Sequence, residues 1–317
     1  GTYSYQWFSN TTNSATGGTP LSIATNSIYT PVTTPPGTVY YYCVVTTDAS
    51  GCETTSSLSE VIVNEGPSIS QEPLATQTVC LDGITTPLEV DYINGVGTPT
   101  YQWYSSGLTC DTSDLSNPIL GETTNTFTPP SIPVGSINYF AVLTFADGGC
   151  DPIVSACALV TVVPDPTVTI ESAAPTPICI DGTISDIEVS TTGGTGSVSY
   201  DWYISDVAGT LISIHPNSTD SATFNPGVFT TAGEFHFVAV ANFDGSGCDQ
   251  APSLVVTVEV VNDPVLTAPL STQTICENST PTDLEVIATG GTGTYSYQWF
   301  SNTTNSATGG TPLSIAT

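Results

Sequence analysis

The chain has 317 residues, of which 39% are hydrophobic and 9% charged, a composition typical of globular rather than disordered proteins. Its 29 Asp and Glu residues are accompanied by no Lys or Arg, so the formal net charge is −29. Phosphates and anionic lipids are bound mainly through Lys and Arg, so we expect no nucleic-acid partner and no attraction to a membrane surface.

The two ends of the chain carry the same sequence. Residues 1–25, GTYSYQWFSNTTNSATGGTPLSIAT, recur unchanged at 293–317. The offset is 292 residues (293 minus 1), so the chain holds one full repeat unit and the start of another. Surface positions tolerate substitution, so an identity this long indicates recent copying. We therefore expect a segment of a longer array.

The first predicted strand ends at Trp7. Alternation in its sequence places Tyr3, Tyr5 and Trp7 on one face, as in a half-buried strand. The same YQW or YDW pattern recurs at three later tryptophans, with spacings of 96, 99 and 97 residues: Trp103, Trp202 and Trp299. Each interval predicts one domain with a buried tryptophan.

The remaining elements follow in a fixed order. After the Trp strand come an aromatic-Pro segment (29–31), an aromatic-rich strand (40–45), a turn with Asp and Gly, and a Val-rich strand (61–63). Each later Trp strand is also preceded by an apolar-alternating strand, and no segment has helical periodicity. These short strands predict an all-β fold, a tandem array of immunoglobulin-like antiparallel β-sandwich domains. A solenoid is the alternative, but the period is too long for one.

Acidic residues next to prolines mark the predicted domain borders. The motifs VNEGP, VPDP and VNDP divide the chain into the C-terminal part of repeat A (1–63), repeat B (64–163), repeat C (164–262) and the N-terminal part of the next repeat A (263–317). The first and last pieces are complementary parts of one domain type, each with an open core and an unpaired edge. Either the array continues in both directions, or subunits complete one another by strand exchange.

Nine cysteines without a Cys-x-x-Cys pair indicate disulfides and an oxidising, extracellular location. Every unit has an early Cys before its first long strand and a late Cys in a Gly-Cys turn. Regular spacing favours one bond within each domain: Cys80–Cys150, Cys179–Cys248, and Cys276 with the next-copy equivalent of Cys52. The alternative joins consecutive domains, for example Cys80–Cys248.

Three cysteines have no equivalents in the other units. Cys110 and Cys157 both lie in the second domain, so we expect them to bond to each other. Cys43 aligns with Ala141 and Ala239, so it is interpreted as a small buried hydrophobic residue rather than a reactive thiol.

Catalysis is not expected. An enzyme needs a base, a nucleophile and an oxyanion donor placed together, and this chain has only two His and no Lys or Arg to supply such groups. Calcium is the one candidate cofactor, through carboxylates in the Gly-containing turns and linkers: Asp48, Asp147, Asp244, Glu65, Asp165 and Asp263. The same residues also serve ordinary turns, and no segment has a dense DxDxDG spacing. No apolar run approaches the roughly 20 residues of a membrane-spanning helix, so direct membrane insertion is not expected.

Two stretches carry a family resemblance: GGTGTYSYQW at residues 290–299 and AGEFHFVAVANFDGSGC at residues 232–248. With the preceding Cys, they resemble the repeats of giant Bacteroidetes surface proteins, including the SprB-like gliding adhesins. The resemblance implies type IX secretion, display on the bacterial cell surface, and a filament that gives reach and tensile strength for attachment or gliding. Ser221, within Asp-Ser-Ala, resembles the O-glycosylation sites of that phylum.

The expected partners are further copies of the array and a surface polysaccharide or other substratum. In one hypothesis the filament itself adheres. In the alternative, it is a passive spacer that presents a carbohydrate-binding module or enzyme encoded elsewhere in the chain.

Overall fold

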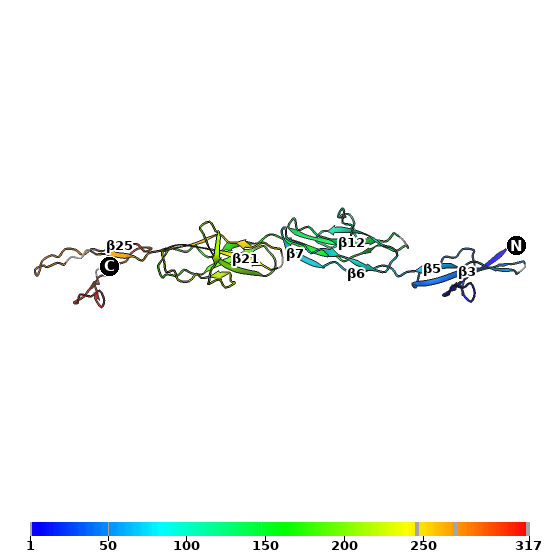
Figure 1. The fold of residues 1–317 in the computed structure, drawn as a ribbon, viewed down its shortest axis with the longest axis horizontal. Helices are drawn as coiled ribbons and strands as arrows, with labels where there is room; N and C mark the ends of the chain where they lie inside the picture. The colour runs from blue at the N-terminus through cyan, green and yellow to red at the C-terminus, as the bar shows by residue number, and fades with distance from the viewer. Residues whose placement is uncertain (1, 50, 147, 245–246, 269–271, 315–317) are drawn as a thin grey trace. The chain divides into compact units, whose positions relative to one another are not determined.

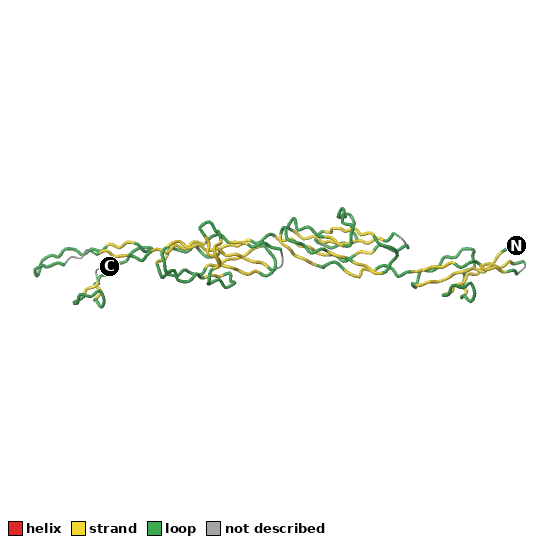
Figure 2. The backbone as a smooth tube through the Cα atoms, viewed as in Figure 1, coloured by secondary structure: helices red, strands yellow, loops and turns green. Residues whose placement is uncertain are grey.

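A computed structural model of the chain describes residues 2–49, 51–146, 148–244, 247–268 and 272–314. These residues form strands and loops without any helix (Figure 2). Contacts divide the chain into two units. The first comprises Gly1–Gln77, Thr85–Pro130 and Gly135–Thr161, and the second comprises Thr78–Ile84, Ser131–Val134 and Val162–Thr317. We call the four predicted domains the first module (1–63), second module (64–163), third module (164–262) and last module (263–317).

The second module is a two-layer sandwich whose labelled strands include β6, β7 and β12 (Figure 1). The larger sheet has the order β10 (Thr100–Ser106), β12 (Gly135–Thr144), β14 (Ala158–Val163), β7 (Thr76–Cys80), with β13 (Ile153–Val154) beside β12. The facing layer consists of the pairs β6 (Ser68–Gln71) with β9 (Asp91–Ile93), and β8 (Leu88–Glu89) with β11 (Thr126–Phe127).

The core of the second module forms around Trp103, which is completely buried. Leu88 and Val90 of the facing layer are also 0% exposed, and Phe127 pairs with Leu88 across β11 and β8. The ring centroids of Trp103 and Phe127 are 5.6 Å apart. Burial of each large apolar side chain stabilises the fold by about 1.5–3 kcal/mol, so the facing layer is essential to the module.

The third module repeats this plan. One sheet has the order β16 (Ile178–Cys179), β23 (Val256–Val261), β21 (Gly233–Phe243), β18 (Val198–Ser205), β19 (Leu211–Ile214), with β22 (Ala251–Pro252) beside β21. The other has the order β15 (Thr167–Ile170), β17 (Ile187–Thr192), β20 (Thr223–Phe224). Trp202 is 0% exposed, and Ile187 pairs with Phe224 as Leu88 pairs with Phe127.

The end modules each contain part of this plan. The first module has one sheet, in the order β2 (Thr19–Pro20), β1 (Tyr3–Asn10), β3 (Gly37–Thr47), β4 (Glu53–Thr55), with β5 (Ser59–Val63) also paired to β3. The last module has two short pairs, β24 (Val265–Thr267) with β25 (Ile287–Thr289), and β26 (Phe300–Ser301) with β27 (Thr311–Pro312).

The predicted fold class is confirmed: the chain is an all-β tandem array of immunoglobulin-like sandwiches. The Trp strands pair with the aromatic-rich strands as the alternation requires, for instance Trp103 opposite Ala141 and Trp202 opposite Ala239. Cys43 lies opposite Trp7 in the same register and is buried, in keeping with a small residue at this position.

Candidate functional site: an intermodule disulfide and its repeated half-sites

A disulfide joins Cys80 of the second module to Cys248 of the third. The two residues are 168 positions apart in the sequence, and their Cα atoms are 5.0 Å apart. This bond corrects the expected pairs Cys80–Cys150 and Cys179–Cys248, neither of which the structure forms. The observed Cys80–Cys248 bond is the alternative pairing predicted from the sequence, in which the disulfide joins consecutive domains.

The physical reason is the position of the cysteines at opposite ends of each sandwich. Cys80 ends β7, and the next residue, Leu81, donates its amide to the carbonyl of Val163 at the C-terminal end of the module. Cys150 instead borders a cavity lined by Asn64 and Pro67 of the preceding linker. A disulfide requires Cα atoms within about 7 Å, so residues at opposite ends of one sandwich cannot pair.

The third module has the same polarity. Cys179 pairs with Val261 at the end of the module, in a parallel register between β16 and β23. Cys248 accepts the amide of Thr195 at 3.4 Å, and the adjacent Gly194 donates its amide to the carbonyl of Pro164 in the linker before the module. Each early Cys therefore lies at the exit end of its module and each late Cys at the entrance end.

The turns that carry the early cysteines have one repeated geometry. The residue two positions after the Cys has positive φ in all three cases, with values of 57° for Asp82, 61° for Asp181 and 63° for Asn278. The following amide then bonds back to the Cys carbonyl, at 3.0, 3.0 and 3.1 Å respectively. We call these turns the exit turns.

The turns that carry the late cysteines share the conformation of one glycine. The glycine before each Cys has positive φ, with values of 64°, 65° and 67° for Gly51, Gly149 and Gly247. This left-handed conformation suits glycine, since it has no Cβ to clash with the backbone. We call these turns the entrance turns.

Exit and entrance turns approach closely where they are bonded. A Cβ added to Gly247 would lie 3.1 Å from the Cα of Gly83, the glycine of the Cys80 exit turn. A Cβ on Gly149 of the other entrance turn would meet nothing within 4 Å. Glycines with nearly the same φ therefore precede both Cys248, which is bonded to Cys80, and Cys150, which forms no disulfide within the described structure.

The second module also contains the bond Cys110–Cys157, the pair expected from the sequence, with Cα atoms 6.1 Å apart. Cys43 is buried, and this burial raises the pKa of its thiol. A thiol kept protonated in this way is a poor nucleophile.

The calcium candidates do not converge. Asp48, Glu65, Asp165, Asp244 and Asp263 are exposed, and Asp147 lies outside the described residues. Asp244 accepts the amide of Ser197 at 2.7 Å, which is a turn contact. Within the described parts of the chain, no three His, Cys, Asp or Glu side chains form a group that could hold a metal ion.

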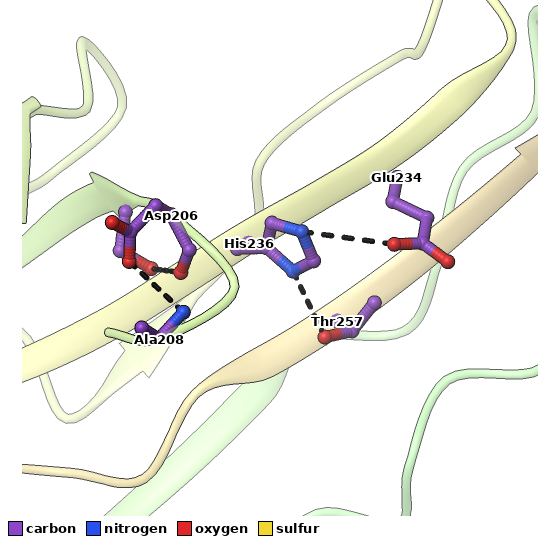
Figure 3. Close-up of polar contacts among 6 residues, drawn as sticks. Asp206, Ala208, Glu234, His236 and Thr257 are labelled. Carbon is purple, nitrogen blue, oxygen red and sulfur yellow. Dashed lines mark hydrogen bonds and ion pairs between the residues drawn. The ribbon is translucent and has the colours of Figure 1, made fainter. Parts of the chain in front are cut away.

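Both histidines have ordinary structural contacts. His236 of β21 faces away from the core and contacts Thr257 of β23 at 3.0 Å, with a carboxylate oxygen of Glu234 at 3.9 Å (Figure 3). His215 packs edge-on against Phe224 and Phe237, and burial lowers its pKa. The Nδ1 atom of His215 also accepts the amide of Asn217 at 3.1 Å.

A repeated buried serine was not predicted from the sequence. Ser155 is 3% exposed; it accepts the amide of Ala141 at 2.9 Å and donates to the carbonyl of Ala156. Ser253 makes the same two bonds with Ala239 and Leu254 in the third module. In the sequence, a serine recurs at a nearly constant number of residues after the Ala or Cys that lies opposite each Trp. This regular spacing is the signal that could have revealed the serines.

Ser221, the candidate glycosylation site, is half-buried. Its hydroxyl accepts the amide of Thr223 at 3.1 Å, and its carbonyl accepts the indole N–H of Trp202 at 2.9 Å. The described part of the chain contains no helix with the length and apolar character to cross a membrane.

No family model and no curated protein match the chain. Similar solved structures include one of Dscam that concerns isoform specificity, with 12% identity and a TM-score of 0.30, covering 70% of this chain and 54% of that one. Another is Rst D1-D2, at 16% identity, TM-score 0.37, 62% of this chain and 100% of that one. A third is Sidekick-1 immunoglobulin domains 1-5, at 16% identity, TM-score 0.27, 91% of this chain and 59% of that one. The chain thus spans about half the length of the Dscam structure.

Proposed function

We propose that this chain is a structural repeat segment of a long extracellular filament or adhesin on a bacterial surface, where it supplies reach and tensile strength for attachment or gliding. The observation that carries the proposal is the Cys80–Cys248 bond, which covalently joins consecutive modules of a unit that repeats every 292 residues. A disulfide between modules strengthens the connection along the array, whereas a disulfide within one module leaves that connection unchanged.

Several further features support this function. The surface is acidic and has no Lys or Arg, so like-charged arrays repel one another and no trypsin-type cleavage site exists. The resemblance to Bacteroidetes surface repeats supports type IX export and gliding, and it makes a surface polysaccharide or substratum the partner of the array. In this proposal the chain has no catalytic activity and needs no cofactor.

The second candidate function is a passive spacer that presents a binding module or enzyme encoded elsewhere. The identical loops of residues 8–18 and 300–310 favour it, because an adhesive surface under selection for ligand binding diversifies between copies.

Electron microscopy of native cell-surface material tests the proposal. We expect thin filaments labelled at regular intervals by an antibody against residues 1–25, the repeated segment. Cells in which the gene is deleted should lose attachment or gliding. Compact, singly labelled particles would contradict a filament, and normal attachment and gliding without the gene would contradict a role in attachment or gliding.

A further inference from the structure

A glutamine side chain closes the exit turn of the second module. Gln77 lies three residues before Cys80, and Thr86 lies six residues after it. The Nε2 atom of Gln77 donates to the Thr86 carbonyl at 2.9 Å, and the Oε1 atom accepts the Thr86 amide at 2.8 Å. One primary carboxamide therefore binds both backbone groups of Thr86 and holds the two sides of the turn together.

The last module has the same pair of bonds. Gln273 lies three residues before Cys276; its Nε2 atom donates to the Thr282 carbonyl at 2.8 Å, and its Oε1 atom accepts the Thr282 amide at 2.8 Å. The spacing from Gln to Thr is nine residues in both modules. We call this pair of bonds the carboxamide clamp. Its recurrence indicates that the backbone beyond the exit turn is shaped to receive a primary carboxamide.

The third module has no glutamine at this position. Thr176 lies three residues before Cys179, where the other two modules have Gln. Ser185 follows Thr176 by nine residues and takes the place of the clamped threonine. Within the described ranges of the chain, neither the amide nor the carbonyl of Ser185 has a hydrogen-bond partner in the protein. The third module therefore presents a clamp whose carboxamide is missing.

A surface pocket of about 300 Å³ lies where the glutamine side chain is absent, and both Thr176 and Ser185 line it. Its apolar wall includes Ile178, Ile184 and Ile187, of which the last two are 9% and 1% exposed. This volume lies at the lower limit of ligand sites in proteins, so the pocket has room for a small ligand. A backbone donor and acceptor beside an apolar wall fit an aliphatic chain that ends in a carboxamide.

We propose that this pocket binds a primary carboxamide on a short aliphatic chain, which is the chemistry of a glutamine side chain. The ligand donates an N–H to the Ser185 carbonyl and accepts the Ser185 amide, as Gln77 does with Thr86 in the second module. Its methylene groups lie against Ile184 and Ile187. This inference is independent of the proposed function, because it concerns a ligand of one module and not the connection between modules.

The paired bonds select against close relatives of the ligand. A carboxylate has no N–H to donate, and it would meet the Ser185 carbonyl and the carboxylate of Asp186, another residue of the pocket. A secondary amide is trans, so its N–H and its carbonyl oxygen point to opposite sides and cannot both reach Ser185. The N-acetyl groups of polysaccharides are secondary amides, so the pocket is distinct from the polysaccharide contact of the proposed function.

A chemical-shift titration of the isotope-labelled full chain with propionamide tests the site. We expect a saturable shift of the Ser185 amide and of its neighbours Ile184 and Asp186. We expect no comparable shift of Thr86, because Gln77 already binds its backbone. Propionate and N-methylpropionamide at the same concentrations should give no saturable shift. Equal shifts with all three compounds, or no shift of Ser185 with propionamide, would overturn the proposal.

Reciprocal substitutions move the site between modules. Thr176→Gln supplies the missing carboxamide, so it should abolish the response of Ser185 to propionamide. The matched control Thr176→Val adds no carboxamide and should leave the titration unchanged. Gln77→Thr should open a site in the second module, where propionamide then shifts the Thr86 amide. A Ser185 response that persists in Thr176→Gln would refute the assigned position of the ligand.

Free glutamine and a glutamine side chain within a polypeptide carry the same carboxamide, and two further titrations distinguish them. L-Glutamine probes the free amino acid. The peptide acetyl-Gly-Gln-Gly-N-methylamide probes the side chain within a polypeptide and contains no second primary amide. The compound that saturates the Ser185 shift at the lower concentration identifies the source of the ligand. Failure of both compounds to shift Ser185 would overturn the assignment to glutamine.

Discussion

Removal of the Cys80–Cys248 bond should lengthen the fully stretched chain by a defined amount. The bond excludes 168 residues from extension, of which 47 remain closed by Cys110–Cys157 when the longer loop opens, so that about 120 residues are released. At roughly 3.3–3.6 Å per extended residue, the double variant Cys80→Ser/Cys248→Ser gains about 40 nm of contour length.

Single-molecule force spectroscopy of the chain, held at its two ends, measures this length directly. The matched control is Cys179→Ser, because the structure places Cys179 outside any disulfide of the single chain. Its contour length should equal that of the unmodified chain. If Cys179 were instead bonded to Cys248, the control would gain the 69 residues between them, about 24 nm, and the intermodule pairing would be wrong.

Three further predictions concern stability. Ser155→Ala leaves the buried amide of Ala141 without its acceptor and should lower the free energy of unfolding in urea by about 1–3 kcal/mol. Ser56→Ala, at the exposed equivalent position, should lower it much less. Equal losses in the two variants would refute the role of burial. The pKa of His215 is lower in the folded chain than in the unfolded chain, so as the pH falls the imidazole becomes protonated in the unfolded chain before it does in the folded one. The free energy of unfolding should therefore decrease as the pH drops below about 6.5. His215→Asn should flatten that part of the pH profile, and an unchanged slope would exclude His215 as its source. The exposed carboxylates predict a melting temperature that EDTA does not change, and a clear shift on calcium addition would contradict this.

The sequence was sufficient for the fold because its signals are local. Alternation around Trp103 and Trp202, together with their regular spacing, determines strand identity and the buried face. The repeat of the aromatic-rich strands then gives the module length. These patterns depend on neighbouring residues, which a single sequence displays.

The predicted disulfide pairing within each domain was wrong, because the true pairing depends on the direction in which each strand runs through its module. Cys80 and Cys150 are 70 residues apart, a spacing that fits a bond within one domain. Strand β7 runs toward the exit end of its module, and the turn before Cys150 lies at the entrance end. That polarity cannot be deduced from spacing, so the sequence left the pairing between consecutive domains as an alternative.

Disulfide mapping of the monomeric full chain, purified without reductant and digested by a Glu- or Asp-specific protease, tests the intermodule disulfide most directly. The intermodule disulfide predicts a peptide pair that contains Cys80 and Cys248, with Cys150 and Cys179 recovered as thiols. Recovery of Cys80 joined to Cys150 and of Cys179 joined to Cys248 would contradict the intermodule disulfide, which is the observation that carries the proposed function.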